Sequence, residues 1–169
     1  MSGQRLHIIQ GQYEVAQGDL DCCMTTVLGS CISVCLYDPV ALAGGMNHFL
    51  LATGRTGGTN SASYGVNAME LLINGLLKLG ANRRRLRAPV FGGAQMMAGL
   101  GNIGARNAVF SADFLRAEGM RIMTCSTGGT QARRVNFWPA TGRAKEELIG
   151  HRIVETPPAS GPGGEVELF

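Results

Sequence analysis

Apolar and polar residues alternate with a period of two in the segment that follows Gly29. Between Gly29 and Tyr37 every second position is apolar, at Ile32, Val34 and Leu36. This period places one row of side chains on a buried face and predicts a β-strand. By the same pattern, residues 25–28 end an earlier strand, and residues 46–51 begin a third strand after a turn at Gly44-Gly45.

The middle of the chain changes to the three- and four-residue spacing of an amphipathic helix. A first helix is predicted from about Tyr64 to Leu79, with its apolar face at Val66, Met69, Leu72, Ile73, Leu76 and Leu77. A second begins around residues 103–107 and stops at Gly119, with its face at Ala105, Ala108, Val109, Ala112 and Leu115. We expect both faces to pack on a sheet, although a helix that binds a partner protein would show the same pattern.

Further strands are predicted at residues 86–91, 121–126 and 135–137, and His7 falls in a first strand near the N-terminus. Residues 52–61 and 127–134 are rich in glycine and polar residues and are predicted to be loops. Short strands together with two helices indicate a mixed α/β (α+β) fold. The 25 glycines fit a chain with many tight turns.

Length and composition indicate one compact domain, since 45% of the 169 residues are hydrophobic and only 16% are charged. We assign residues 1–155 to this domain and residues 156–169 to a flexible C-terminal tail, because residues 156–164 are dominated by proline and glycine. The last five residues alternate acidic and apolar side chains. Both a frayed terminus and a short docking strand for a partner fit this pattern.

The formal net charge of +3 is too small and too dispersed to predict binding of nucleic acid. One basic cluster, at Arg83, Arg84, Arg85 and Arg87, fits a solvated turn, with contact to a glutamate-rich partner surface as the alternative. The chain shows neither a signal-peptide pattern nor an apolar segment of transmembrane length. We therefore expect a cytoplasmic monomer without membrane insertion, in which the five cysteines stay reduced.

A nucleophile and a base occur together only around the first predicted turn. Cys31 follows the Gly29-Ser30 turn, and His48 lies on the strand that folds back beside it. A cysteine thiol needs such a base, because its ordinary pKa of about 8.5 leaves little thiolate at neutral pH. Thr25 is the candidate to orient the imidazole. The backbone amides of Gly29 and Ser30, with that of Cys31, are candidate donors to a substrate oxyanion.

A zinc site is the alternative use of these cysteines. The thiols of Cys22, Cys23, Cys31, Cys35 and Cys125, together with His48, supply suitable ligand types. Adjacent Cys22 and Cys23 point to opposite faces of an extended chain, and Cys31 and Cys35 lack the spacing of a zinc knuckle. We therefore predict that the cysteines other than Cys31 are buried apolar residues.

Four segments resemble the chemoreceptor glutamine deamidases of the CheD family. They are Leu28-Gly29-Ser30-Cys31-Ile32, Gly44 to Leu51, Phe91-Gly92-Gly93-Ala94 and Ile103-Gly104-Ala105-Arg106-Asn107, in the same order over roughly residues 6–148. The resemblance implies a catalytic triad of Cys31, His48 and Thr25. It also implies a fold similar to the catalytic domain of the cytotoxic necrotizing factor toxins, with mixed β-sheets in a sandwich-like core and helices packed outside.

The function implied by this resemblance is hydrolysis of glutamine side chains of methyl-accepting chemotaxis receptors to glutamate. The cysteine chemistry needs neither a metal nor an organic cofactor, and it accepts a methyl ester as a second substrate. A CheC-type phosphatase is a second candidate partner, and a non-catalytic adaptor that binds receptors or this phosphatase is the alternative function. The chain departs from the family pattern at Ser126, where an acidic residue is usual, and at Ala132, where a glycine is usual.

Overall fold

The computed structural model describes residues 3–51, 54–96 and 102–150, with only the backbone described at 54–62. The predicted tail at 156–169 and His151 lie outside these residues. None of the helices in the described part is long and apolar enough to cross a membrane.

The described strands form two sheets. The four-stranded sheet has the order β1-β3-β8-β9, and the five-stranded sheet has the order β2-β5-β4-β6-β7. Both sheets are mixed, because β1 pairs with β3 and β6 with β7 in parallel, whereas the other pairs are antiparallel. The strands are β1 Arg5–His7, β2 Tyr13–Gln17, β3 Cys23–Leu28, β4 Ile32–Asp38, β5 Ala43–Asn47, β6 Arg87–Gly92, β7 Arg121–Thr127, β8 Arg133–Trp138 and β9 Arg143–Leu148.

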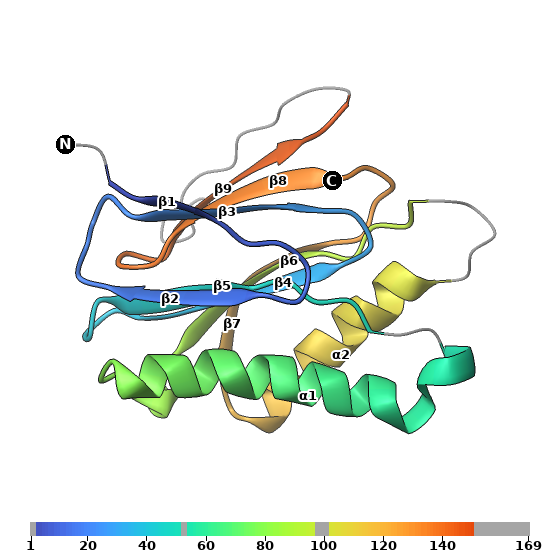
Figure 1. Cartoon of the computed structure of the whole chain (residues 1–169), viewed down its shortest axis with the longest axis horizontal. Helices are drawn as coiled ribbons and strands as arrows, with labels where there is room; N and C mark the ends of the chain where they lie inside the picture. The colour runs from blue at the N-terminus through green and yellow to red at the C-terminus, as the bar shows by residue number, and fades with distance from the viewer. Residues whose placement is uncertain (1–2, 52–53, 97–101, 151–169) are drawn as a thin grey trace.

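The molecule has three layers (Figure 1). The helices α1 (Gly54–Lys78) and α2 (Ile103–Ala117) cover one face of the five-stranded sheet, and the four-stranded sheet covers the other. A short 3₁₀ helix, η1 (Arg83–Arg85), links α1 to β6. The predicted fold class, mixed sheets in a sandwich-like core with helices outside, is confirmed.

Strand β4 lies in the middle of the five-stranded sheet and is buried on both faces. Its apolar residues Ile32, Val34 and Leu36 pack in the core under the helices. Cys35 and Tyr37 pack in the second core, between the two sheets. The predicted period of two is therefore confirmed, and it assigns the odd-numbered side chains, including that of Cys31 just before the strand, to the space between the sheets.

The predicted turn at Gly44-Gly45 is wrong, because both glycines lie inside β5. The chain turns earlier, where Leu42 adopts a positive φ of 55°. A Cβ at Gly45 would lie 2.8 Å from Leu72 Cδ1 on α1. The glycines thus allow close packing of strands and helix rather than a tight bend.

Both helices differ from prediction in detail. Helix α1 begins at Gly54, so most of the predicted loop at 52–61 is helical, because extending an existing helix costs little even through weak helix formers. Its predicted core face is confirmed at Met69, Leu72, Ile73 and Leu76, but Val66 is exposed. In α2 the predicted face is confirmed at Leu115, but the full buried face consists of Gly104, Asn107, Ser111 and Leu115. A pattern search for apolar residues misses this face because three of its four members are small or polar.

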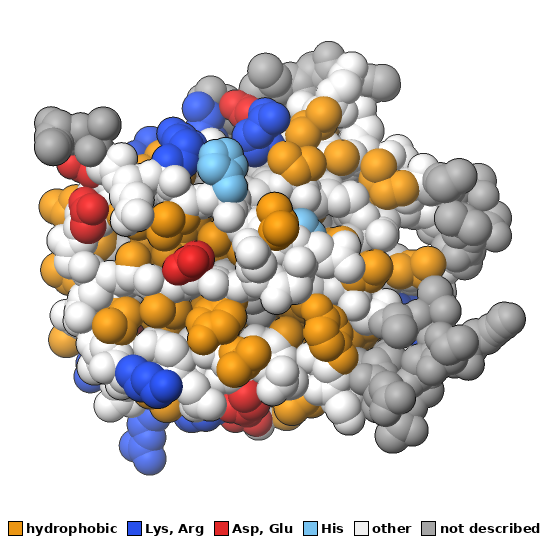
Figure 2. Space-filling view, viewed as in Figure 1, with side chains coloured by type: hydrophobic (Ala, Val, Ile, Leu, Met, Phe, Trp, Pro, Cys, Tyr) orange, Lys and Arg blue, Asp and Glu red, His pale blue; other side chains and the backbone are white. Residues whose placement is uncertain are grey.

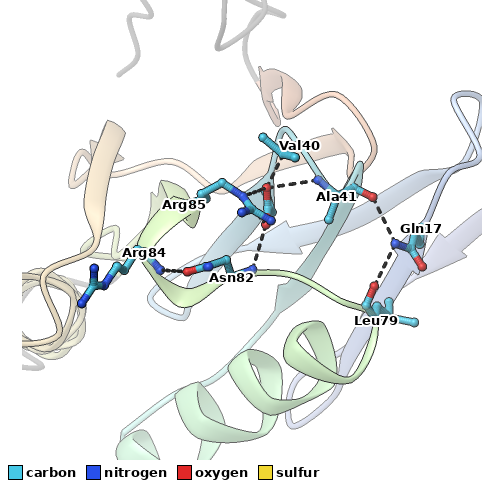
Figure 3. A network of polar contacts seen from close by, with 8 residues as sticks. Gln17, Val40, Ala41, Leu79, Asn82, Arg84 and Arg85 are labelled. Carbon is cyan, nitrogen blue, oxygen red and sulfur yellow. Dashed lines mark hydrogen bonds and ion pairs between the residues drawn. The ribbon is translucent and has the colours of Figure 1, made fainter.

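The turn after β4 is held by the buried carboxylate of Asp38 (Figure 3). Its oxygens accept hydrogen bonds from the amides of Val40, Ala41 and Asn82 and from Nε of Arg85, at 2.8–3.2 Å. These donors lower the pKa of Asp38 to about 2 despite its burial. Two arginines of the predicted basic cluster are therefore paired within the chain. Arg85 pairs with Asp38, and Arg83 pairs with Glu70 and Glu118.

Replacement of Asp38 by asparagine is expected to lower the free energy of unfolding at pH 7 by about 2 kcal/mol. The carboxyl has a lower pKa in the folded than in the unfolded chain, so its contribution is present above about pH 4 and is lost as the pH falls toward 2. Urea unfolding of wild type and Asp38→Asn between pH 7 and pH 2 checks this. A difference between the two proteins that stays constant over that range contradicts it.

Candidate active site

The loop that carries Cys31 is held from one side through its carbonyl groups. The Gly29 carbonyl accepts a hydrogen bond from the amide of Ala94 at 3.0 Å, and the Cys31 carbonyl accepts one from the amide of Gly93 at 2.8 Å. Between them, the Ser30 carbonyl accepts a hydrogen bond from Nδ2 of Asn107 at 2.8 Å. Three consecutive carbonyls of this loop are thus fixed by partners far away in the sequence.

This arrangement sets the direction of the loop's amide groups. In a trans peptide, the N–H of a residue points opposite to the carbonyl of the residue before it. The amides of Ser30 and Cys31 therefore point away from Ala94 and Asn107, respectively. Whether they also lie close enough to the Cys31 sulfur to serve a substrate oxyanion stays a prediction. Gly29 matters for packing: a Cβ there would lie 3.1 Å from Met96 Cγ, so the lack of a side chain lets Met96 lie close to the loop.

The Gly92-Gly93 pair gives the segment after β6 the shape that brings its amide to the loop. Both residues have positive φ, at 113° and 68°. A Cβ at Gly93 would lie 2.8 Å from the carbonyl oxygen of Gly104 at the start of α2. Only glycine allows this conformation and this close approach. The third and fourth segments of the resemblance therefore meet behind the nucleophile.

Asn107 connects the two segments that carry the candidate nucleophile and base. Its side chain is fully buried on α2, where Oδ1 accepts a hydrogen bond from the amide of Leu51 at 3.0 Å while Nδ2 binds the Ser30 carbonyl. Leu51 lies three residues after His48. The residue pattern assigns no role to Asn107, and its position in the segment 103–107 is the only signal in the sequence.

Cys31 and His48 lie on either side of one backbone pair. Ile32 and Phe49 exchange two N–H···O bonds of 2.9 Å, and both side chains enter the core under the helices. Because neighbouring residues of an extended chain point to opposite faces, the side chains of Cys31 and His48 share the other face. They form a diagonal cross-strand pair, which is typically within reach of long side chains.

The hydroxyl that contacts the His48 imidazole belongs to Thr26. Its Oγ1 lies 2.8 Å from His48 Nδ1 and donates to the Ile8 carbonyl at 2.5 Å. A carbonyl only accepts, so the single hydroxyl proton is used there and Oγ1 must accept from Nδ1–H of His48. The Ile8 carbonyl is also 3.4 Å from Nδ1. The imidazole is therefore the Nδ1–H tautomer, and Nε2 carries the lone pair that accepts a proton.

The expectation that Thr25 orients the base is not met by this geometry. Thr26 shares a face of β3 with Met24 and Leu28, which pack in the core between the sheets. Thr25 is the next residue along the strand, so its side chain lies on the opposite face. Two adjacent threonines could each contact His48 as far as the sequence shows. Only the register of β3 decides which of them faces the imidazole.

Burial shifts both groups toward their neutral forms. It raises the pKa of the Cys31 thiol above 9.0 and lowers the pKa of the His48 imidazole below 6.5, with the bond to the Ile8 carbonyl partly opposing the second shift. At neutral pH the site therefore holds a neutral thiol and a neutral imidazole on the same face of the sheet. Neutral groups of this kind would need proton transfer to the imidazole during attack, because no preformed thiolate is favoured.

A cavity of about 340 Å³ opens beside the imidazole. Its lining includes His48, Thr26, Gln10 and Arg134. A second cavity of about 80 Å³ reaches His48 from the seam between β2 and α1, where hydrophobic side chains gather at the surface (Figure 2). The base is thus approached from two sides, and the larger cavity has room for an extended polar side chain.

The described cysteines do not form a zinc site. Within the described ranges, no three histidine, cysteine, aspartate or glutamate side chains gather where a metal ion would fit. Cys22 and Cys35 are buried, and burial raises the pKa of both thiols, which disfavours the thiolate that zinc requires. Cys125, by contrast, is exposed, so the prediction that it is buried is wrong.

Known proteins similar in sequence to this chain belong to one family. A family model described as CheD chemotactic sensory transduction matches residues 50–147. A protein of Agrobacterium fabrum named probable chemoreceptor glutamine deamidase CheD is 48% identical over 99% of this chain and 98% of its own length. The chain belongs to the CheD family. Proteins of the same name from Rhizobium rhizogenes (53% identity, 86% of this chain, 80% of theirs) and a Caulobacter species (49%, 98% and 93%) are also similar.

One solved structure, a Neisseria meningitidis protein of the DUF152 family, covers 75% of this chain and 63% of its own with 9% identity and a TM-score of 0.46. At that distance it bears on neither the fold nor the function. The CheD assignment therefore rests on sequence similarity alone.

The departure from the CheD pattern at Ser126 is accommodated in the interior. Arg133 is fully buried, and its Nη1 donates to the Ser126 carbonyl at 2.9 Å and to Glu146 Oε2 at 3.2 Å. The Ser126 hydroxyl donates to the same carboxylate at 2.9 Å. The negative charge next to this arginine thus comes from β9. Arg133 also donates to the Gly128 carbonyl through Nη2. The amide of Gly128 in turn donates to the Gly92 carbonyl, so the network is linked to the end of β6.

Proposed function

We propose that this CheD-family chain hydrolyses glutamine side chains of chemoreceptors, with Cys31 as nucleophile and His48 as base. The observation that supports it most is the arrangement at His48, where Thr26 and the Ile8 carbonyl bind Nδ1 and leave Nε2 for the proton of a thiol on the same face. The names of the relatives point to the same substrate, a chemoreceptor glutamine.

The proposed reaction has two halves. The Cys31 sulfur attacks the carboxamide carbon while Nε2 of His48 takes the thiol proton, and the carbonyl oxygen becomes an oxyanion near the amides of Ser30 and Cys31. His48 then returns the proton to nitrogen, and ammonia leaves as the thioester forms. A water molecule that gives its proton to His48 hydrolyses the thioester, which leaves glutamate and the free thiol.

The same steps apply to a glutamate methyl ester. Methanol replaces ammonia as the leaving group, and the thioester is identical. Hydrolysis of receptor methyl esters is therefore a second activity of the proposed site. Binding of a CheC-type phosphatase and a monomeric state stay predictions.

Intact mass of a receptor cytoplasmic fragment tests the function. Incubation with wild type is expected to add about one mass unit per converted glutamine, because NH₂ is replaced by OH, and Cys31→Ala is expected to leave the mass unchanged. Peptide sequencing locates the sites. Absence of conversion with several receptors, together with stable binding to them, favours the alternative function of a non-catalytic adaptor.

The two neighbouring threonines provide a matched pair of variants. Thr26→Val is expected to lower kcat about tenfold, because the imidazole loses the hydrogen bond that fixes its tautomer, and a bond of that kind is worth about 1 kcal/mol. Thr25→Val keeps this bond and is expected to stay within about twofold of wild type. The initial rate of ammonia release measures both. The reverse order of effects would return the orienting role to Thr25.

A further inference from the structure

One glutamine of the chain lies on the candidate nucleophile. The thiol of Cys31 donates a hydrogen bond to Oε1 of Gln10, with Sγ and Oε1 3.7 Å apart. Gln10 also lines the 340 Å³ cavity that opens at His48. A primary carboxamide, the group that the proposed reaction consumes, therefore already contacts the thiol.

The backbone around Gln10 is fixed to the strand of His48. Gln10 follows Ile9 in a turn closed by a bond of 3.0 Å from the Gln12 amide to the Ile9 carbonyl. Gly11, with φ of 90°, donates its amide to the His48 carbonyl at 2.8 Å, and the His48 amide donates to the Gln12 carbonyl. The turn thus presents the side chain of residue 10 to the reactive pair.

The side chain itself is free to leave. Gln10 is exposed, whereas Cys31 retains only 9% of its accessible surface. The contact is made to the carboxamide oxygen, which during attack would have to lie at the amides of Ser30 and Cys31 instead. In the observed contact the carboxamide oxygen, and not its carbon, faces the thiol, so Gln10 is not placed for attack.

We propose that Gln10 is an internal mimic of the substrate carboxamide, which a receptor glutamine must displace before it reaches Cys31. The inference rests on the proposed function. If Gln10 occupies the site in some of the molecules, only the remaining fraction can bind substrate, and the apparent affinity is reduced by that fraction. The chemical step after binding is unchanged. The mimic therefore raises KM and leaves kcat alone.

Gln10→Ala is expected to lower KM for a receptor fragment by about three- to tenfold, the range that corresponds to one neutral hydrogen bond, with kcat within about twofold. Gln4→Ala, the same change at an exposed glutamine without such a contact, is the control. A fall in kcat would show that Gln10 assists the reaction, and unchanged KM and kcat would show that the contact has no effect. Either result overturns the proposal.

A second readout does not depend on receptor turnover. Alkylation of Cys31 by iodoacetamide, followed by mass spectrometry of the peptide that contains Cys31, is expected to be faster in Gln10→Ala by about the same factor as the change in KM. Equal rates in the two proteins overturn the proposal. If alkylation is faster but no receptor is converted, Gln10 does shield the thiol but the proposed function fails, and with it the interpretation of Gln10 as a substrate mimic. The same spectra show whether residue 10 has become glutamate, which would make Gln10 a substrate and not a mimic.

Discussion

Deamidation by the His48→Gln variant is expected to fall by between about 10² and 10⁴ relative to wild type, the range that a positioned general base contributes. Glutamine keeps a polar side chain of similar length but does not take the thiol proton. Initial rates of ammonia release from a receptor fragment measure the loss. A variant within tenfold of wild type would remove His48 from the reaction.

The acidic limb of the wild-type pH profile identifies the group that titrates. Protonated imidazole does not accept the thiol proton, so kcat/KM must fall as His48 becomes charged. Because burial lowers its pKa below 6.5, the half-maximal value is expected below pH 6.5, and activity is expected to stay level between pH 7 and 8. The residual activity of His48→Gln should lack this limb. A midpoint above pH 6.5 contradicts the expectation.

Glu146→Gln is expected to lower the free energy of unfolding by about 3–5 kcal/mol, because it removes the charge of the Glu146 carboxylate, which pairs with the buried guanidinium of Arg133. Urea unfolding measures the change. Glu147→Gln, one residue further along β9, breaks the more exposed pair with Arg134 and should cost less than about 1 kcal/mol. Similar losses of unfolding free energy in the two variants would show that the buried pair stabilises the fold no more than the exposed pair.

Replacing both partners of the interior pair separates charge from packing. Arg133→Met combined with Glu146→Leu removes both charges while keeping much of the volume, so the double variant is expected to be more stable than Glu146→Gln alone. A double variant less stable than the single variant would assign the effect to lost packing and hydrogen bonds rather than to an uncompensated charge.

The sequence predicts those elements whose burial is carried by apolar side chains. The period of two identifies β4 because Ile32, Val34 and Leu36 are all apolar, and the face of α1 is correct at Leu72 and Leu76 for the same reason. Strand β9 was not predicted, because the residue at the centre of its buried row is Glu146. Strand β2 was not predicted either, since it is an edge strand with exposed and half-buried residues.

The sequence predicts that Cys31 and His48 share a face, but it does not predict which residue of β3 contacts the imidazole. The cysteine and histidine are placed on one face of neighbouring strands, as the alternation around Ile32 and Phe49 requires. A one-residue difference on β3 separates Thr25 from Thr26, and sequence alone has no means of fixing it. Asn107 was missed because its effect depends on long-range bonds to the segments of Ser30 and Leu51.

The bonds that hold the Cys31 loop also set when the site can form. The ribosome adds Cys31 and His48 early, but the partners of the loop carbonyls, Gly93, Ala94 and Asn107, follow 62 to 77 positions after the residues that they bind. A nascent chain shorter than this carries Cys31 without the residues that bind the carbonyls of its loop. Its thiol has the reactivity of any cysteine in an unfolded peptide until α2 has been synthesised and packed.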